Sequence, residues 1–231
     1  MIHPATIRAI TLDLDDTLWP IAPTMVRAEA ALQAYLREHA PVTAVLCYQQ
    51  GGLARIRQQL QAEWHDRLHD LSALRRETIR RALVESGENA DLAVPAFELF
   101  FEARQQVDLY EDALEALSFL ASRYPVVALS NGNADVHRVG LGQHFHAAVS
   151  AQAFGVSKPD PRIFHEAASL AGVTAAEVLH IGDDAHLDVL GARAAGMQCA
   201  WLNRHEQAWP DGSEPPLTFT SLRDLVNHLA A

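Results

Sequence analysis

The chain is nearly devoid of lysine. Of its 18 basic residues, 17 are arginine and one, Lys158, is lysine. Arginine does not replace lysine where a compact point charge is needed, so we expect the single lysine to have a specific role. No block of basic residues occurs, and the formal net charge is -11. An acidic chain without a basic patch repels polyanions, so nucleic acid is excluded as an expected partner.

Cysteine and long apolar runs are also scarce. The two cysteines, Cys47 and Cys199, lie far apart without metal-ligand spacing, which predicts free thiols in a reducing compartment. No apolar run approaches the roughly 20 residues of a membrane helix, and the first residues lack the apolar stretch of a signal peptide. We therefore expect a cytoplasmic protein without a membrane partner, and the sequence leaves a monomer and a homodimer both open.

The pattern of apolar residues predicts two kinds of structure. From Thr24 to about Arg104 these residues recur at helical spacing, which predicts roughly four helices and no strand. The remainder alternates strands with helices, which predicts an α/β fold with a Rossmann-like, doubly wound parallel sheet. We expect this sheet to be built from residues 1–20 and 108–231, with residues 21–107 inserted as an all-helical cap. The expected strands are residues 9–14, 126–129, 147–150, 178–181 and 197–202, with a helix between Asn133 and Ala147.

Three carboxylates, Asp13, Asp15 and Asp16, lie within four residues at the carboxyl end of the first predicted strand. Parallel sheets bind ligands at the carboxyl ends of their strands. At such an edge Asp13 can attack phosphorus as a nucleophile, Asp15 can act as acid and then base, and Thr17 can donate to a carboxylate or bind the substrate's phosphate. The alternative is an Asp-rich turn that caps a helix. We assign no role to Asp16.

Two further polar segments follow predicted strands. The hydroxyl of Ser130 can donate to a phosphoryl oxygen while the neighbouring groups of Asn131 and Gly132 cradle it, although an ordinary strand-to-helix turn has the same composition. Lys158 stands between Ser157 and Pro159, where its ammonium can neutralise both a nucleophilic carboxylate and a phosphate. The alternative for Lys158 is a solvated surface residue.

A last acidic group comprises Asp183, Asp184 and Asp188. Such oxygen ligands suit Mg²⁺, whereas acids at a helix N-terminus are the alternative.

Beside the first carboxylates, Trp19 can stack on a substrate ring or pack in the core. In the helical insert, Arg75 can contact the substrate or belong to an ordinary helix face.

The four segments resemble, in type, order and approximate spacing, the four motifs of the haloacid dehalogenase (HAD) superfamily of phosphohydrolases. Residues 13–17 resemble the first motif, with Asp16 where many members have glycine. Ser130 resembles the second motif, Lys158 the third, and residues 182–188 the fourth. The resemblance implies a Rossmann-like core with a helical cap inserted after the first motif.

The resemblance also implies a mechanism and a cofactor. It implies a Mg²⁺-dependent phosphomonoester hydrolase that forms an aspartyl-phosphate and acts on a small-molecule substrate. Asp13, the backbone carbonyl of Asp15, and Asp183 are the expected metal ligands, with Asp184 and Asp188 as the polar groups behind them.

Residues 130–134, 140–145 and 180–189 further resemble bacterial phosphatases of flavin mononucleotide and of the ribityl-pyrimidine phosphate of riboflavin synthesis. A phosphatase of sugar phosphates or nucleotides, or a sugar-phosphate mutase, stays open. A dehalogenase would not need Asp15, and a phosphonate-cleaving relative would need a second lysine. A non-catalytic member would be expected to have lost a motif, and none is lost here.

Overall fold

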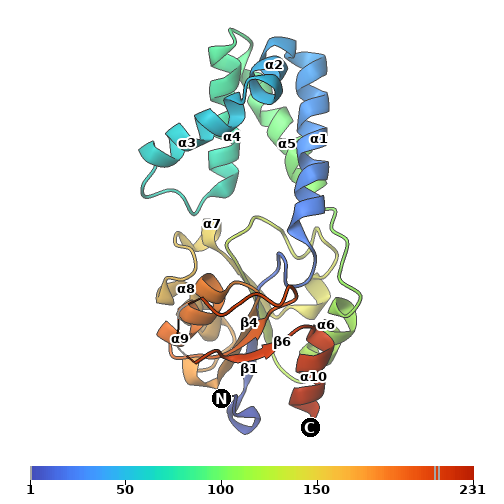
Figure 1. The fold of residues 1–231 in the computed structure, drawn as a ribbon, viewed down its shortest axis with the longest axis vertical. Helices are drawn as coiled ribbons and strands as arrows, with labels where there is room; N and C mark the ends of the chain where they lie inside the picture. Colours follow the sequence, from blue (N-terminus) through green and yellow to red (C-terminus); the bar gives the residue numbers. More distant parts are fainter. Residues whose placement is uncertain (1, 211, 213) are drawn as a thin grey trace. The chain divides into compact units, whose positions relative to one another are not determined.

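The computed structural model describes residues 2–210, 212 and 214–231 and divides the chain into two compact units (Figure 1). Unit 1 comprises residues 1–20 and 108–231, and unit 2 comprises residues 21–107. Among the described residues, no helix combines the length and apolar character needed to cross a membrane.

Unit 1 is built on a parallel sheet. Its strands are β1 (Ala9–Leu12), β2 (Val126–Ser130), β3 (Ala147–Ser150), β4 (Val178–Gly182), β5 (Gln198–Leu202) and β6 (Leu217–Phe219). Their order is β3-β2-β1-β4-β5-β6, and every neighbouring pair is parallel. The three central strands are buried along their whole length, as expected for a parallel sheet covered on both faces. The predicted α/β, Rossmann-like fold class is confirmed.

Helices cover both faces of this sheet (Figure 1). The helices of unit 1 are α6 (Ala113–Ala121), α7 (Ala151–Phe154), α8 (Pro161–Leu170), α9 (Gly191–Ala194) and α10 (Leu222–Ala230). Short helical turns are η1 (Pro4–Thr6), η3 (Gly142–His144), η4 (Ala175–Glu177) and the π-helical η5 (Ala185–Leu190). On the face of α8 and α9, Ile163 and Phe164 pack in a buried cluster with Val127, Val178 and Trp201. The core of unit 1 therefore fixes the strands whose ends carry the polar segments.

The register of the central strands brings those segments to one edge. Leu12 of β1 pairs with Ala128 of β2 and with Ile181 of β4. The amide of Asp13 donates to the carbonyl of Ile181 at 2.9 Å, so the chain is held in the sheet as far as this carboxylate. Strand ends far apart in the sequence thus present their polar residues together.

Unit 2 is helical throughout. It contains α1 (Ile21–His39), α2 (Pro41–Gln49), α3 (Gly52–Glu63), α4 (Leu71–Glu85), η2 (Ala90–Leu92) and α5 (Ala93–Arg104). Its own buried cluster includes Leu32 and Leu36 of α1, Ile56 of α3, Ile79 of α4 and Phe97 of α5. The helical character agrees with the sequence pattern, but there are five α-helices rather than about four.

Three local expectations differ from the structure. The helix expected between Asn133 and Ala147 is wrong: only the short η3 forms there, and Gly140 has φ 87°, a left-handed conformation that interrupts a helix. Helix α1 already begins at Ile21, because the first turn of a helix tolerates a proline such as Pro23. Strand β6 had no counterpart among the expected strands, since it has three residues and lies at the sheet edge.

A tight turn follows β1. Asp16 has φ 57°, one of two non-glycine residues with positive φ among those described. Its amide donates to the carbonyl of Trp19 at 2.7 Å, which closes the turn. Glycine adopts this conformation without penalty, and aspartate is one of the few other residues that tolerate it. The conformation explains why a position that is glycine in many relatives can be Asp16 here.

We expect Asp16→Gly to be more stable than Asp16→Ala by roughly 1 kcal/mol, because both lose the carboxylate but only alanine keeps the cost of the left-handed conformation. Urea denaturation of the two variants measures the difference in the free energy of unfolding. Equal stability of the two variants would show that the turn does not hold position 16 in the left-handed region.

Candidate active site

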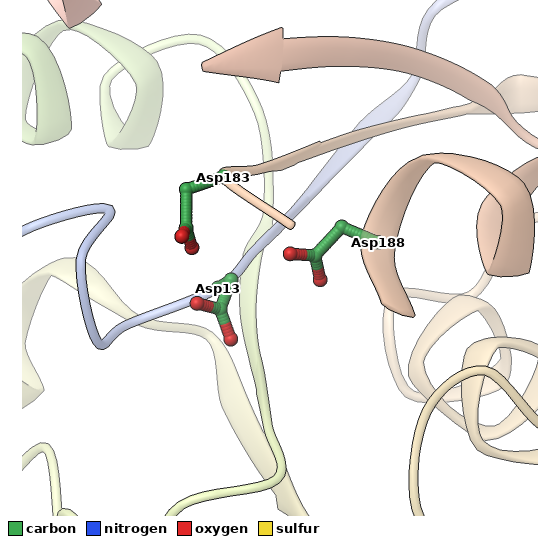
Figure 2. A group of neighbouring side chains, drawn as sticks. All are labelled: Asp13, Asp183 and Asp188. Atoms are coloured by element: carbon green, nitrogen blue, oxygen red, sulfur yellow. The ribbon is translucent and has the colours of Figure 1, made fainter. Parts of the chain in front are cut away.

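Three carboxylates gather at the carboxyl edge of the sheet. Asp13 follows β1, Asp183 follows β4, and Asp188 lies in η5 (Figure 2). Each offers one oxygen, and these oxygens lie within 4.8 Å of one another. Asp13 and Asp188 are buried, and Asp183 is partly exposed. Segments separated by more than 160 residues in the sequence therefore build one acidic cluster.

Lys158 is the cation of this cluster. Its Nζ donates to Oδ1 of Asp13 and, at 2.6 Å, to Oδ1 of Asp188. The residue is only 3% exposed. Burial opposes its charge, but the two carboxylates raise the pKa of Lys158 above its ordinary value, so the ammonium stays protonated. The surface-lysine alternative does not hold, because the only lysine of the chain is buried between two acids.

Asp188 is held on both oxygens. Besides Lys158, Oδ1 contacts Nε2 of His180 at 3.0 Å, and Oδ2 accepts from the amide of Asp184 at 3.0 Å. Although burial disfavours its charge, Lys158 and His180 hold the pKa of Asp188 below its ordinary value. An ionised carboxylate only accepts, so Nε2 of His180 carries the proton, and Nδ1 accepts from Thr11 at 2.9 Å. Asp188 thereby fixes the position of the Lys158 ammonium.

Sequence reasoning missed His180, which is fully buried in β4. Burial lowers the pKa of its imidazole, which therefore stays neutral. The sequence feature that could have identified His180 is its position as a polar residue within an otherwise apolar strand.

Asn131 and Gly132 have other partners than the expected phosphate. The side-chain oxygen of Asn131 accepts from the amide of Lys158 at 2.7 Å, and its amide nitrogen donates to the carbonyl of the same residue at 3.0 Å. The amide of Gly132 donates to Oγ of Ser130 at 2.9 Å. Asn131 thus positions the backbone of Lys158. Because Oγ of Ser130 accepts this bond, its own hydroxyl proton is directed to another acceptor.

Asp183 is held from two sides. Thr17, fully buried, donates from Oγ1 to Oδ1 of Asp183 at 3.3 Å. The indole of Trp201 donates to the backbone carbonyl of Asp183 at 2.7 Å. Thr17 therefore donates to a carboxylate and has no surface on which to receive a substrate.

The charges of the cluster do not balance. Three carboxylates surround one ammonium, which leaves an excess of two negative charges when all are ionised. Burial raises the pKa of Asp13 well above its ordinary value, with Lys158 opposing the shift and Asp188 adding to it. Burial, followed by repulsion from Asp188 and Asp16, raises the pKa of Asp183 to about 7. The protein accommodates the excess either by taking up protons or by binding a cation.

The donor set fits a hard divalent cation. Mg²⁺ binds through few carboxylates and keeps several waters, which matches acidic oxygens from Asp13 and Asp183. Both oxygens of Asp188 already accept hydrogen bonds within the protein. We therefore expect Asp13 and Asp183 to contact the cation directly, with Asp188 holding Lys158 behind them. A ligand role for the backbone carbonyl of Asp15 stays a prediction.

Asp15 and Trp19 form a pair of their own. The indole Nε1 of Trp19 donates to Oδ1 of Asp15 at 2.8 Å. Trp19 is fully buried, so its ring has no free face for a substrate, and the structure gives it a packing and orienting position instead. Asp184 similarly accepts from the amides of His186 and Leu187, which makes it the N-cap of η5.

Arg75 is partly buried and contacts other residues of unit 2. Its Nη1 forms an ion pair with Glu29, and its guanidinium lies 4.3 Å from the centroid of the Phe100 ring. These contacts correspond to the expected alternative, a residue engaged within its own helical domain, rather than to a free substrate ligand.

Comparison with known proteins decides the family. Residues 7–196 match the haloacid dehalogenase-like hydrolases. The chain belongs to the haloacid dehalogenase-like hydrolase family. The resemblance carried by the four sequence motifs is confirmed, and the chain is an enzyme of the hydrolase class.

Individual relatives within the haloacid dehalogenase-like family differ in chemistry. The chain is 32% identical to the 5-amino-6-(5-phospho-D-ribitylamino)uracil phosphatase YigB of Escherichia coli, over 96% of this chain and 95% of that protein. It is 33% identical to a phosphoserine phosphatase of Thermus thermophilus, over 65% of this chain and 63% of that protein. A crystal structure described as a 2-haloacid dehalogenase from Pseudomonas syringae is 38% identical, with a TM-score of 0.91 over 97% of this chain and 98% of that one.

Gly182 makes room for the carboxylate of Asp188, so we expect Gly182→Ala to disturb the cluster. An added Cβ would lie 2.7 Å from Cβ of Asp188 and would overlap its carboxylate. We expect a loss of roughly 1–3 kcal/mol in the free energy of unfolding, measured by urea denaturation. The matched comparison is with Asp188→Ala, in which the overlap with the carboxylate is removed and only the contact with Cβ remains. If adding Gly182→Ala to Asp188→Ala costs as much as adding it to the wild type, the overlap is not the cause.

We expect a divalent cation to bind less tightly as pH falls through about 7. The raised pKa of Asp183 means that its carboxyl is ionised above about pH 7 and protonated below it, so at low pH the cation must displace a proton. Between pH 8 and pH 6 the Kd for Mn²⁺, measured by isothermal titration calorimetry, should rise by roughly tenfold. Asp183→Asn carries no such proton and should bind weakly at both pH values. A wild-type Kd that is constant over this range contradicts the expectation.

Proposed function

We propose that the chain is a Mg²⁺-dependent phosphomonoester hydrolase that acts through an aspartyl-phosphate on Asp13. The observation that carries the proposal is the cluster of three carboxylates at the carboxyl edge of the sheet, two of which are bonded to the buried Lys158. Phosphoryl transfer depends mainly on positioning and on neutralisation of the phosphoryl oxygens, and this cluster can do both. The identity of 32% with a bacterial phosphatase over nearly the whole chain supports the same activity.

In the first step Asp13 attacks phosphorus. Lys158 occupies Oδ1 of Asp13, so Oδ2 is the attacking oxygen, and the bond from phosphorus to the leaving oxygen breaks as the new bond forms. The hydroxyl of Ser130 and the ammonium of Lys158 bind the phosphoryl oxygens. Asp13 and Asp183 would hold a divalent cation, which would supply neutralisation of the negative charge of the phosphoryl group.

Asp15 acts as the general acid in the first step and as the general base in the second. It protonates the leaving oxygen as the ester bond breaks, and it then takes a proton from the water that hydrolyses the aspartyl-phosphate. The second step restores the Asp13 carboxylate and releases inorganic phosphate. The hydrogen bond from Trp19 to Oδ1 supports this role because it fixes the orientation of the Asp15 carboxylate.

We further propose that unit 1 carries the chemistry and unit 2 selects the substrate. All groups assigned above to the reaction belong to unit 1. The proposed substrate is a small phosphomonoester, either flavin mononucleotide or the ribityl-pyrimidine phosphate on which the Escherichia coli relative is named to act. A sugar phosphate or a nucleotide, and a sugar-phosphate mutase reaction, are the alternatives.

A dehalogenase is the second candidate, because a crystal structure 38% identical to this chain is described as one. Attack of a carboxylate on carbon requires no acid at the position of Asp15. Asp15 therefore favours the phosphatase. Release of halide from 2-chloropropionate, without phosphate release from any ester, would reverse the choice.

We expect the protein to hydrolyse phosphomonoesters with Mg²⁺ and to lose the activity in a chelator. In a panel containing flavin mononucleotide, the ribityl-pyrimidine phosphate, sugar phosphates and nucleotides, kcat/KM should be highest for one of the first two. Asp13→Asn should reduce activity to the background, and Asp15→Asn should lower kcat by roughly 10²–10⁴-fold.

The matched control is Asp91→Asn, which alters an exposed carboxylate of unit 2 that has no place in the mechanism. It should leave kcat and KM unchanged. Wild-type activity in Asp13→Asn, or in the presence of a chelator, would refute the mechanism. Equal kcat/KM for flavin mononucleotide and for generic sugar phosphates would refute only the assignment of the substrate.

A further inference from the structure

Arg204 lies just after β5 and contacts two stretches that are distant from it and from each other in the sequence. Its Nη2 donates to the backbone carbonyl of Thr17 at 3.0 Å and to Oδ1 of Asp112 at 2.9 Å, while Nη1 donates to Oδ2 of Asp112 at 3.2 Å. Its Cζ lies 4.0 Å from the centroid of the Tyr110 ring. The planar guanidinium therefore forms a two-pronged ion pair on one edge and stacks on an aromatic face, which lysine cannot reproduce.

These contacts join the two segments at which the chain leaves and re-enters unit 1. Thr17 precedes the boundary at residue 20, and Tyr110 and Asp112 follow the boundary at residue 108. The amide of Tyr110 donates to the carbonyl of Leu18 at 2.9 Å, so the two segments are also bonded directly. Arg204 lies against both of them.

Asp112, the ion-pair partner of Arg204, is itself held by a further hydrogen bond. Oδ2 of Asp112 accepts from the amide of Leu222, at the start of α10, at 2.7 Å. The side chains of Arg204 and Asp112 are 11% and 9% exposed, so solvent screens their ion pair only weakly. The guanidinium is thus tied to the C-terminal helix on one side and is available to hold Thr17 on the other.

Thr17 connects this arrangement to the acidic cluster. The same residue that accepts from Arg204 at its carbonyl donates from its hydroxyl to Asp183 at 3.3 Å. Thr17 also lies two residues after Asp15 in the turn that carries the proposed acid and nucleophile. A shift of the Thr17 backbone therefore moves the hydroxyl that orients Asp183.

We propose that Arg204 is a positioning residue that holds the turn of Thr17 and, through it, the Asp183 carboxylate in the geometry that binds the cation and supports turnover. The proposal rests on the proposed phosphatase function for its kinetic consequences. Its consequence for cation binding is independent of that function. Because its guanidinium is engaged by Thr17, Asp112 and Tyr110, Arg204 acts through other residues rather than on the substrate.

The test compares Arg204→Gln and Arg204→Lys with the wild type, using p-nitrophenyl phosphate as the substrate. We expect Arg204→Gln to lower kcat by roughly tenfold to a hundredfold with KM changed by less than about twofold, since misplacement of a reacting group acts mainly on kcat. The Mg²⁺ concentration for half-maximal activity should rise. Arg204→Lys keeps the positive charge but lacks the planar guanidinium that donates two hydrogen bonds side by side. Its kcat should therefore lie between those of Arg204→Gln and the wild type.

Binding of Mn²⁺, measured by calorimetry without substrate, supplies the readout that does not depend on activity. Arg204→Gln should bind Mn²⁺ more weakly than the wild type, even if the wild type shows no phosphatase activity. Failure of the proposed function would appear as an inactive wild type with this difference in Mn²⁺ binding intact. Unchanged Mn²⁺ binding in folded Arg204→Gln would overturn the positioning role.

Two controls separate positioning from general stability. Like Arg204, Arg193 lies near an aromatic ring, that of Trp209, and donates to a backbone carbonyl, that of Glu214. Arg193→Gln therefore removes a comparable arginine and should leave kcat and Mn²⁺ binding unchanged. Millimolar guanidinium should restore part of the kcat of Arg204→Ala. If Arg204→Gln does not fold, Asp112→Asn tests the same anchor and should reproduce the loss of kcat and of Mn²⁺ affinity. A folded Arg204 or Asp112 variant that raises KM alone, or only lowers the melting temperature, overturns the proposal.

Discussion

The interaction on which the site depends is the burial of Lys158 between Asp13 and Asp188. Removing a lysine and two carboxylates from water is costly, and the cost is offset because the charges meet at hydrogen-bond distance and the Asp188 oxygens have further partners. His180 and the backbone of Asp184 supply those partners, and Asn131 holds the backbone of Lys158. Asp13, the proposed nucleophile, is thus held in a hydrogen-bonded network of the protein's own groups, which is the kind of preorganisation that electrostatic catalysis requires.

The network is also unbalanced. Asp183 adds a carboxylate that no lysine or arginine side chain compensates among its described contacts, and the pKa values of Asp13 and Asp183 rise in response. A site whose charge is incomplete without a divalent cation favours binding of that cation over a merely structural role. The overall fold does not make the choice between a phosphatase and a dehalogenase, because relatives described as each share this family.

The sequence predicted what depends on local pattern and on parallel topology. Aspartates that follow apolar runs can be recognised in the sequence as strand ends, and a parallel sheet brings the carboxyl ends of its strands together. The grouping of Asp13, Lys158 and Asp183 could therefore be expected. Long-range partners could not be expected in the same way. That Asn131 would bind the backbone of Lys158, or that Trp19 would be buried against Asp15, depends on tertiary packing that sequence spacing does not encode. The same limit applies in unit 2, where the ion pair of Arg75 with Glu29 joins α4 to α1.

The rarity of lysine has a practical consequence for chemical labelling. The only side-chain amine of the chain is the buried, protonated Nζ of Lys158, whereas reagents for amines require an accessible, neutral nitrogen. The folded surface described here therefore offers such reagents no side-chain target. Acylation of Lys158 would report that the acidic cluster has opened, which makes this residue an internal probe of the integrity of the site.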